Sequence, residues 1–493
     1  MLLSYYEGGI KFNTEVKIKP YMFTPSAKKT PYKNMEGNYV EKKLFSSPFE
    51  ARQFIREHEG IDGYNLYGST YFDYVWINDN YKDLKSDNSI LRIGNYDIET
   101  DSDGGYADIK TANKEIISIA IQVMADNEIY CFGLKDAQPI QEILDREGVT
   151  KNVIYIKCEN ERDLLIKFVE TWQRLKMDVI TGWNIRGYDH TYLIRRLVRL
   201  FGDDMAKSLS PFGIIEENTF TMYGREQTEY DIVGIPTLDY MECYKKFSFK
   251  NSESFKLDYI SHVVLNKKKL DYSKYKTLNR LYQENPALFF TYNIIDIVRV
   301  AELENELKFI ELIFSLSHFT LTNLSDAFAT VKPCDVVIHN KMMEYKVVVP
   351  HKKAESNELS RIIAGGYVRE VLPGLYPYVM SFDFTALYSH IIMAYNISPD
   401  AYMGKLDKYD TLDNPDRIIN DHVYDEIHQT LLDNNMCITA KGTVFSRDKK
   451  SFFAEIMEEV FDKRKYYKDI MLQEEQNLED IKKELSRRNI LSP

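Results

Sequence analysis

Asp383 could hold a divalent metal ion for nucleotidyl transfer. The stretch Ser381-Phe-Asp-Phe-Thr-Ala-Leu-Tyr-Ser-His-Ile-Ile392 places Asp383 at the end of a hydrophobic, strand-like run and just before a Leu-Tyr turn. This arrangement suits a divalent metal and a triphosphate, and two-metal chemistry needs a second carboxylate from a separate segment. No Asp-x-Asp follows Ile392 in the printed sequence. We therefore expect the other half of this site on a second polypeptide.

A second set of carboxylates begins at Asp97-Ile-Glu99. On a strand, residues at i and i+2 share one face, so these two side chains could share metal ions. The tripeptide is common and, taken alone, is more often a solvated strand end. Its context is therefore what gives it weight.

Two later segments complete an ordered series. Gly182-Trp-Asn-Ile-Arg-Gly-Tyr-Asp189 ends a strand and places Asp189 at the start of a helix. Tyr292-Asn-Ile-Ile-Asp296 places a tyrosine and an aspartate on one helix face. Tyr292 could hold a water molecule against a metal that Asp296 ligates, although each segment alone could be a helix cap or a surface pair. The order Asp-x-Glu, Asn-x-x-x-Tyr-Asp, Tyr-x-x-x-Asp is much more specific than any of its members.

The elements that must position these residues can be read from hydrophobic periodicity. Strands are predicted at 91–97, 116–123, 128–134 and 179–183, and helices at 161–175 and 190–201. Strands followed by helices over 92–305 predict an α/β domain with a mixed sheet. A long helix over 303–316 should leave this domain, a second strand system should begin over 371–392, and 453–488 should be helical and charged.

Length and composition limit the function classes. A chain of 493 residues exceeds a single hydrophobic core, so about three domains are expected. A net charge of −12 argues against a nonspecific nucleic-acid coat, but it permits a local basic groove. Five scattered cysteines without Cys-x-x-Cys disfavour a zinc site or a disulfide framework. With no long apolar run or signal peptide, we expect a cytoplasmic protein without a membrane partner.

The ordered carboxylate series resembles the 3′–5′ proofreading exonuclease of family B DNA polymerases. The family usually has Phe before the second-motif aspartate, where this chain has Tyr188. The resemblance implies a ribonuclease H-like exonuclease domain that hydrolyses phosphodiester bonds, with Tyr292 orienting the attacking water and Asn184 contacting DNA. It implies that two Mg²⁺ (or Mn²⁺) ions, one activating water and one stabilising the leaving 3′ oxygen, are bound by Asp97, Glu99, Asp189 and Asp296.

The segment from Asp383 to Ile392 resembles the palm motif of the same family, Asp-x-x-Ser-Leu-Tyr-Pro-Ser-Ile-Ile. Ala386, Ser389 and His390 depart from that pattern. The resemblance implies that Asp383 ligates both metals of a polymerase site, that the Phe384 carbonyl ligates one, and that Tyr388 stacks under the sugar. The residues that this motif would place around a nucleotide are Thr385, Ala386, Leu387 and Tyr388.

Two further segments fit the same family. Ile363-Ala-Gly-Gly366 stands where the family has Tyr-x-Gly-Gly, which implies template contacts by Gly365 and Gly366. Arg464 and Lys468 lie one turn apart in a segment that resembles the first fingers helix, where they could grip a triphosphate. A solvated basic helix is the alternative interpretation of that pair.

Segments such as Lys245-Lys-Phe-Ser-Phe249 and Leu372-Pro-Gly374 resemble the T-even bacteriophage branch of the family. The resemblance implies an α/β and α+β multidomain protein. The expected parts are an N-terminal domain (1–91 and 309–354), the exonuclease (92–308), a partial palm (355–448) and the first half of the fingers (449–493). The chain would be the N-terminal subunit of a split replicative polymerase, located in the host cytoplasm if phage-encoded, and inactive in synthesis alone. Its partner chain would supply a second fingers helix, an Asp-Thr-Asp-Ser motif and a thumb. Primer-template DNA and dNTP would be its substrates.

Two alternatives remain open at this point. One is a stand-alone 3′–5′ DNA exonuclease whose palm segment is a relic. The other is a regulatory module that binds RNA or DNA through the aromatic and basic residues of 1–90.

Overall fold

A computed structural model describes most of the chain. The described residues are 1–61, 63–85, 87–222, 225–248, 252–268, 270–351, 368, 370–412, 414 and 416–488. The chain forms two compact units, the first made of 1–19 and 71–337 and the second of 20–70 and 338–493. The boundaries of these units differ from those of the four domains expected from the sequence. The four domain boundaries stay a prediction.

The first unit is built on a six-stranded mixed sheet. Its strands, in spatial order, are β13 (Thr237–Asp239), β10 (Val179–Gly182), β6 (Ile93–Thr100), β7 (Ile116–Val123), β8 (Glu128–Gly133) and β9 (Asn152–Lys157). β7 runs antiparallel to both of its neighbours, β6 and β8. β13, β10 and β6 are parallel neighbours, and so are β8 and β9. The mixed α/β sheet predicted from the sequence is confirmed.

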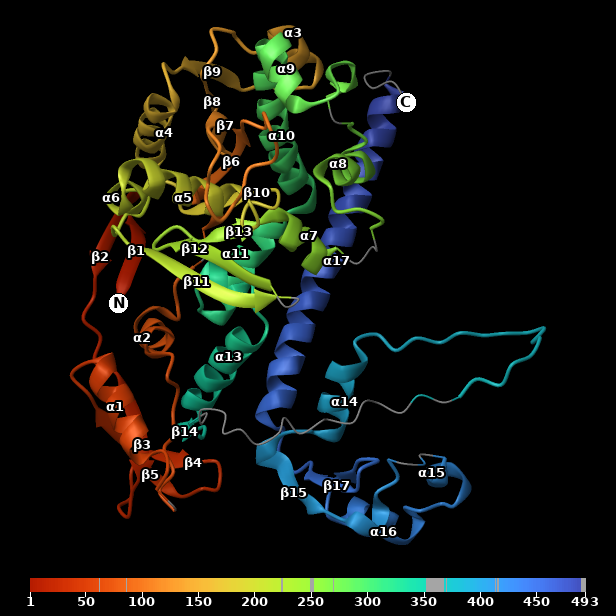
Figure 1. The fold of residues 1–493 in the computed structure, drawn as a ribbon. Helices are drawn as coiled ribbons and strands as arrows, with labels where there is room; N and C mark the ends of the chain where they lie inside the picture. Colours follow the sequence, from red (N-terminus) through yellow and green to blue (C-terminus); the bar gives the residue numbers. More distant parts are fainter. Residues whose placement is uncertain are drawn as a thin grey trace. The chain divides into compact units, whose positions relative to one another are not determined.

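Helices cover both faces of this sheet (Figure 1). Every residue of β7 is buried, because its side chains enter cores on both faces of the sheet. Ile119 and Ile121 belong to the core under α4 (Glu161–Leu175) and α5 (Asp189–Phe201). Ile117 and Ala120 belong to the core under α10 (Pro286–Leu307). The sheet thus forms the middle layer of three.

Local sequence signals set the ends of these helices. The side chain of Asn160 accepts the Asp163 amide at the start of α4, and that of Asn285 accepts the Leu288 amide at the start of α10. The helix expected over 303–316 is wrong as a single element. Lys308 adopts a left-handed conformation (φ 57°) between α10 and α11 (Phe309–Thr320). The buried carboxylate of Glu304 accepts the amides of Ile310 and Glu311 and so stabilises this break.

Two hairpins complete the strands of the first unit. The hairpin of β1 (Leu2–Glu7) and β2 (Ile10–Glu15) is attached through Asp178, which accepts the Tyr6 hydroxyl at 2.7 Å and pairs with Lys11 at 2.6 Å. The second hairpin pairs β11 (Ile215–Met222) with β12 (Arg225–Ile232). Shorter helices of this unit include α7 (Tyr240–Phe247), α8 (Leu257–Leu265) and α9 (Leu278–Glu284).

The second unit contains two small sheets. One joins β14 (Val347–Val348), β4 (Tyr32–Asn34), β5 (Tyr39–Leu44) and β3 (Tyr21–Pro25), and the other joins β15 (Tyr402–Lys405), β17 (Thr443–Ser446) and β16 (Met436–Ile438). Asn396 fixes the end of α14 (Leu387–Tyr395), since its amide nitrogen donates to the carbonyls of Ser446 (2.7 Å) and Lys449 (2.9 Å). Its amide oxygen accepts the Ser451 amide, just before α17 (Phe452–Arg487).

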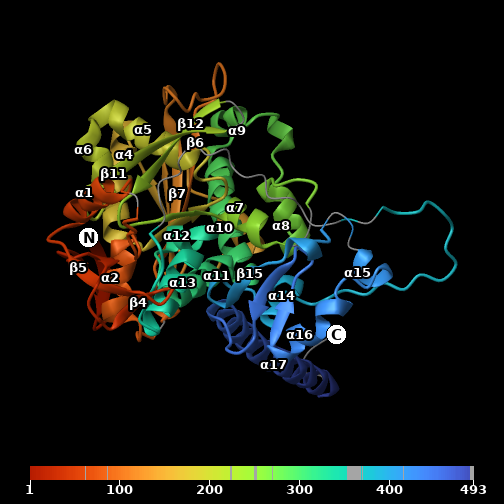
Figure 2. The same cartoon turned by 90° about the horizontal axis from the view of Figure 1, so that it is seen from below.

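The second strand system expected to begin over 371–392 is a wrong prediction, since α14 occupies its end and residues 371–386 precede that helix. These residues have neither helix nor strand and lie exposed, with α14 starting directly after them (Figures 1 and 2). A strand needs a neighbour to satisfy its amides and carbonyls, and no described strand pairs with this segment. Among the described helices, none combines the length and apolar character that a membrane span needs.

Candidate metal site

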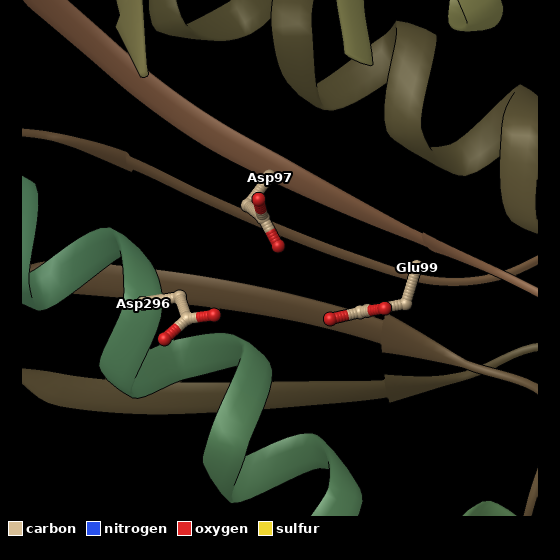
Figure 3. A group of neighbouring side chains, drawn as sticks. All are labelled: Asp97, Glu99 and Asp296. Carbon is tan, nitrogen blue, oxygen red and sulfur yellow. The ribbon is translucent and has the colours of Figure 1, made fainter. Parts of the chain in front are cut away.

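Three carboxylates of the first unit point toward one another (Figure 3). Asp97 and Glu99 come from β6, where period two places both on the face covered by α10, and Asp296 comes from α10 itself. Each side chain offers an oxygen within 4.8 Å of the others, and all three are half-buried. Carboxylate oxygens are the donors that hard divalent cations prefer, so this set fits such an ion. It is the one such group among the described residues.

Asn293 orients the first of these carboxylates. It lies one helical turn before Asp296 on α10, and its side-chain nitrogen donates to Asp97 Oδ2 at 2.7 Å. Its side-chain oxygen accepts the hydroxyl of Ser118 on β7 at 2.8 Å. Both Asn293 and Ser118 are fully buried. Sequence reasoning missed them; Asn293 stands inside the Tyr-x-x-x-Asp motif, but only the sheet register brings Ser118 to it.

Asp189 lies beside the group and has a structural contact of its own. β10 pairs with β6 only as far as Thr181 and Asn95, so the next amides of β6 need another acceptor. Asp189, the first residue of α5, accepts the Ile98 amide at 3.1 Å. Burial, and then the nearby charge of Asp97, raises the pKa of Asp189 well above its ordinary value. A cation at the carboxylates would favour the ionised form.

Tyr292 lies on α10 and packs against Tyr272 of a neighbouring loop. The side chain is buried, and its ring makes an edge-to-face contact with the ring of Tyr272, with centroids 5.4 Å apart. Burial and the charges of Asp296 and Glu99 raise its pKa above the ordinary value. The side chain therefore stays a neutral phenol that can donate a hydrogen bond near the carboxylates.

The turn before Asp189 is shaped by Asp239. Asn184 has a left-handed backbone (φ 58°), and its amide donates to Asp239 Oδ1 while the Arg186 amide donates to Oδ2, each at 3.1 Å. Gly182 passes so close to β6 that a Cβ there would lie 2.9 Å from the Tyr96 carbonyl oxygen. Asp239, at the end of β13, was also missed, since the amides of Asn184 and Arg186 lie far from it in sequence.

Tyr188, which replaces the phenylalanine of the family pattern, makes a contact that a phenylalanine could not make. Its hydroxyl forms a hydrogen bond with the hydroxyl of Thr100, just after Glu99, at 2.8 Å. Its ring stacks on Tyr192 with centroids 5.4 Å apart. The extra hydroxyl thus links the turn to the end of β6.

The residues expected at a polymerase site lie in the second unit. Asp383, Phe384, Thr385 and Tyr388 are exposed, and Ala386 adopts a left-handed conformation before α14. The grouping of carboxylates seen around Asp97 has no counterpart around Asp383 among the described residues. Arg464 and Lys468 are exposed on α17, one turn apart as predicted. Gly365 and Gly366 lie outside the described residues.

Two family models match successive parts of the sequence. The first, DNA polymerase family B, exonuclease domain, matches residues 73–260, and the second, DNA polymerase family B, matches 332–485. Together they cover more than half of the chain. The chain belongs to DNA polymerase family B.

Two phage DNA polymerases align with nearly the whole chain. The DNA-directed DNA polymerase of Escherichia phage RB69 is 30% identical over 497 aligned residues, and that of Enterobacteria phage T4 is 29% identical over 495. Each alignment covers 97% of this chain and 53% of the phage protein. The DNA polymerase delta catalytic subunit of Plasmodium falciparum is 26% identical, covering 79% of this chain and 34% of that protein. This family B chain therefore spans about half the length of its phage relatives.

The matches bear on the expectation of a second polypeptide. The polymerase model falls on residues 332–485 of this family B chain itself. A separate partner chain is therefore not supported, although a polymerase-family segment in the second half of the sequence was expected.

Proposed function

We propose that the first unit is a two-metal 3′–5′ exonuclease that shortens single-stranded DNA ends during DNA replication. The observation that carries this proposal is the convergence of Asp97, Glu99 and Asp296 from two elements of one unit. The family B exonuclease match over residues 73–260 supports it independently. A ribonuclease H-like architecture of this unit belongs to the same proposal.

Binding of the cations would be the task of four carboxylates. Asp97, Glu99 and Asp296 already face one another, and Asp189 stands beside Asp97 with a raised pKa that a cation would lower. When bound, two Mg²⁺ (or Mn²⁺) ions would supply an activated water and stabilise the leaving 3′ oxygen. The half-buried setting limits competition from bulk water, which strengthens the attraction between carboxylates and cations.

Tyr292 would position the attacking water. As a neutral phenol, it can donate a hydrogen bond toward the reacting phosphate or accept one from the water. Because its ring already packs against Tyr272, the side chain would lose little conformational freedom when the DNA end binds. Asn184, proposed from the sequence to contact DNA, serves in the structure to shape the turn before Asp189.

The experiment follows an oligodeoxynucleotide labelled at its 5′ end. With Mg²⁺, the purified chain should give a ladder of products shortened from the 3′ end, each step releasing a nucleoside monophosphate. EDTA should stop the reaction. Release of the 5′ label without a ladder of shortened products, or no digestion at any Mg²⁺ concentration, would contradict the proposal.

A second activity, DNA synthesis, is favoured by the polymerase-family match over 332–485. We propose that Asp383 and the Phe384 carbonyl would bind the metals of that site, and that Tyr388, Arg464 and Lys468 would contact the incoming dNTP. A primer-extension assay on primed template tests this, with Asp383→Ala as its control. Extension by the purified chain would rule out the split organisation that the sequence predicts, and that organisation and a cytoplasmic location stay predictions.

A further inference from the structure

A chain of buried polar groups leads from the core of the first unit to the metal site. Asn293 donates to Asp97 Oδ2, and Ser118 donates to Asn293 Oδ1. Ser118 Oγ also lies 3.9 Å from Cys131 Sγ on β8. These contacts join three neighbouring strands and α10, and none of the three residues behind Asp97 is exposed to solvent.

The chemistry of these groups fixes the direction of the hydrogen bonds. An ionised carboxylate only accepts, so the amide nitrogen of Asn293 must face Asp97. The amide oxygen then faces Ser118, whose single hydroxyl hydrogen must point toward it. The free lone pairs of Ser118 are left for the thiol of Cys131, whose pKa is raised to about 12 by burial, so that the thiol keeps its hydrogen.

Ser118 thereby selects one of the two orientations of the Asn293 amide. If the amide turned over, its oxygen would face the Asp97 carboxylate and its nitrogen would face a hydroxyl. The first contact places two acceptors together at the fully buried side chain of Asn293, which is strongly unfavourable. The hydroxyl on β7 thus determines that a donor faces Asp97.

We propose that Asn293 and Ser118 are positioning residues, which hold the Asp97 carboxylate in the orientation that a divalent cation needs. This inference rests on the proposed function of the site. Neither residue touches the reacting atoms, since each acts through Asp97. A partner behind a metal ligand typically changes metal affinity by about 10–100-fold when removed.

The experiment measures Mn²⁺ binding by electron paramagnetic resonance and, separately, the Mg²⁺ concentration for half-maximal nuclease activity. Asn293→Leu keeps the side-chain size and should weaken Mn²⁺ binding roughly 10–100-fold. Ser118→Ala should weaken it less, by about 3- to 10-fold, the effect of one neutral hydrogen bond. Ser118→Thr keeps the hydroxyl and should bind Mn²⁺ as tightly as the unaltered protein. The Asp97→Ala, Glu99→Ala double variant gives the background from any other Mn²⁺ site.

A control separates positioning from general loss of structure. Ser261→Ala removes another fully buried hydroxyl of the same unit, on α8, which has no hydrogen-bond partner among the described residues. It should leave Mn²⁺ binding unchanged. In the Asn293→Leu background, Ser118→Ala should have no further effect on Mn²⁺ affinity, because Ser118 acts only through the amide.

The outcomes are distinct. Unchanged Mn²⁺ affinity in Ser118→Ala, an equal loss in Ser261→Ala, or additive losses in the double variant would overturn the inference. Should the protein bind Mn²⁺ as expected of these variants but digest no DNA, the proposed exonuclease would fail while the positioning role would stand. If Asn293→Leu does not fold, Ser118→Ala against Ser118→Thr still decides the question.

Discussion

The acidic motifs of the two units differ in how they are built, although the sequence predicted both as metal sites. Asp97, Glu99 and Asp296 lie on a strand and a helix of the first unit that contact each other directly, so their carboxylates converge. Asp383 lies in an exposed segment without strand or helix, ahead of α14. A motif therefore marks the residues, but a site forms only where the elements that carry them are held by their own packing.

The sharpest test of this contrast changes the carboxylates of each unit. Asp97→Ala with Glu99→Ala should lower exonuclease activity by more than the roughly 100-fold upper range for loss of an outer partner, because two ligands disappear. Asp383→Ala should leave exonuclease activity unchanged. Both are measured on the labelled single strand at fixed Mg²⁺. Equal losses in the two variants would break the distinction.

Stability offers a second comparison, between a buried and an exposed arginine. Arg196 pairs with Glu161 and donates to the Ala112 carbonyl, with both side chains of the pair 7% exposed. Arg196→Met leaves a buried carboxylate unpaired and should lower the free energy of unfolding by about 3–5 kcal/mol. Arg464→Ala, on the exposed face of α17, should change it by no more than about 0.5 kcal/mol. Urea unfolding followed by circular dichroism measures both, and similar losses would show that α17 is packed.

Removing one hydroxyl tests how far the first site depends on its details. Tyr292→Phe keeps the ring contact with Tyr272 but loses the group that would hold water. We expect kcat to fall about 100-fold, at the low end for loss of a proton-handling group, with Mn²⁺ binding unchanged. A full rate in this variant would exclude Tyr292 from the reaction.

The smallest expected effect concerns His190, behind Asp189. It is fully buried, its Nδ1 lies 3.0 Å from the Tyr96 hydroxyl, and burial lowers its pKa to about 3 from an ordinary 6.5. The unfolded chain therefore binds this proton first, so stability falls as the pH drops below 6.5 and continues to fall toward 3. His190→Gln should flatten this slope and change little at pH 7. An unfolding series between pH 7 and 4 checks it, and a steeper slope in the variant would contradict it.

Periodicity alone predicted much of the first unit. The strand at 116–123 and the helix at 161–175 have the bounds that the sequence indicates, because β7 is apolar throughout and α4 carries one apolar face. The break at Lys308 was missed, since it depends on the side chain of Glu304 turning back to amides that follow it. Such a contact leaves no periodic trace.

The partners of the metal site were beyond sequence reasoning for a related reason. Ser118 reaches Asn293 through the pairing of β6 with β7 and the packing of α10 across them. Asp239 reaches the amides of Asn184 and Arg186 because β13 and β10 are neighbours. In the second unit, hydrophobic residues over 371–386 resemble a strand, but sequence does not show whether a neighbouring strand is there to pair with them.

The hydrogen bond from the Ile98 amide to Asp189 has a consequence for how this residue can vary. One carboxylate accepts a backbone amide of β6 and, in the proposed function, would also bind a cation. An asparagine there could still accept the amide, so it would preserve the fold while removing the charge; an alanine would remove both. Asp189→Asn variants without nuclease activity should therefore stay folded more readily than Asp189→Ala variants. Among inactive variants at this position, asparagine should be found more often than alanine.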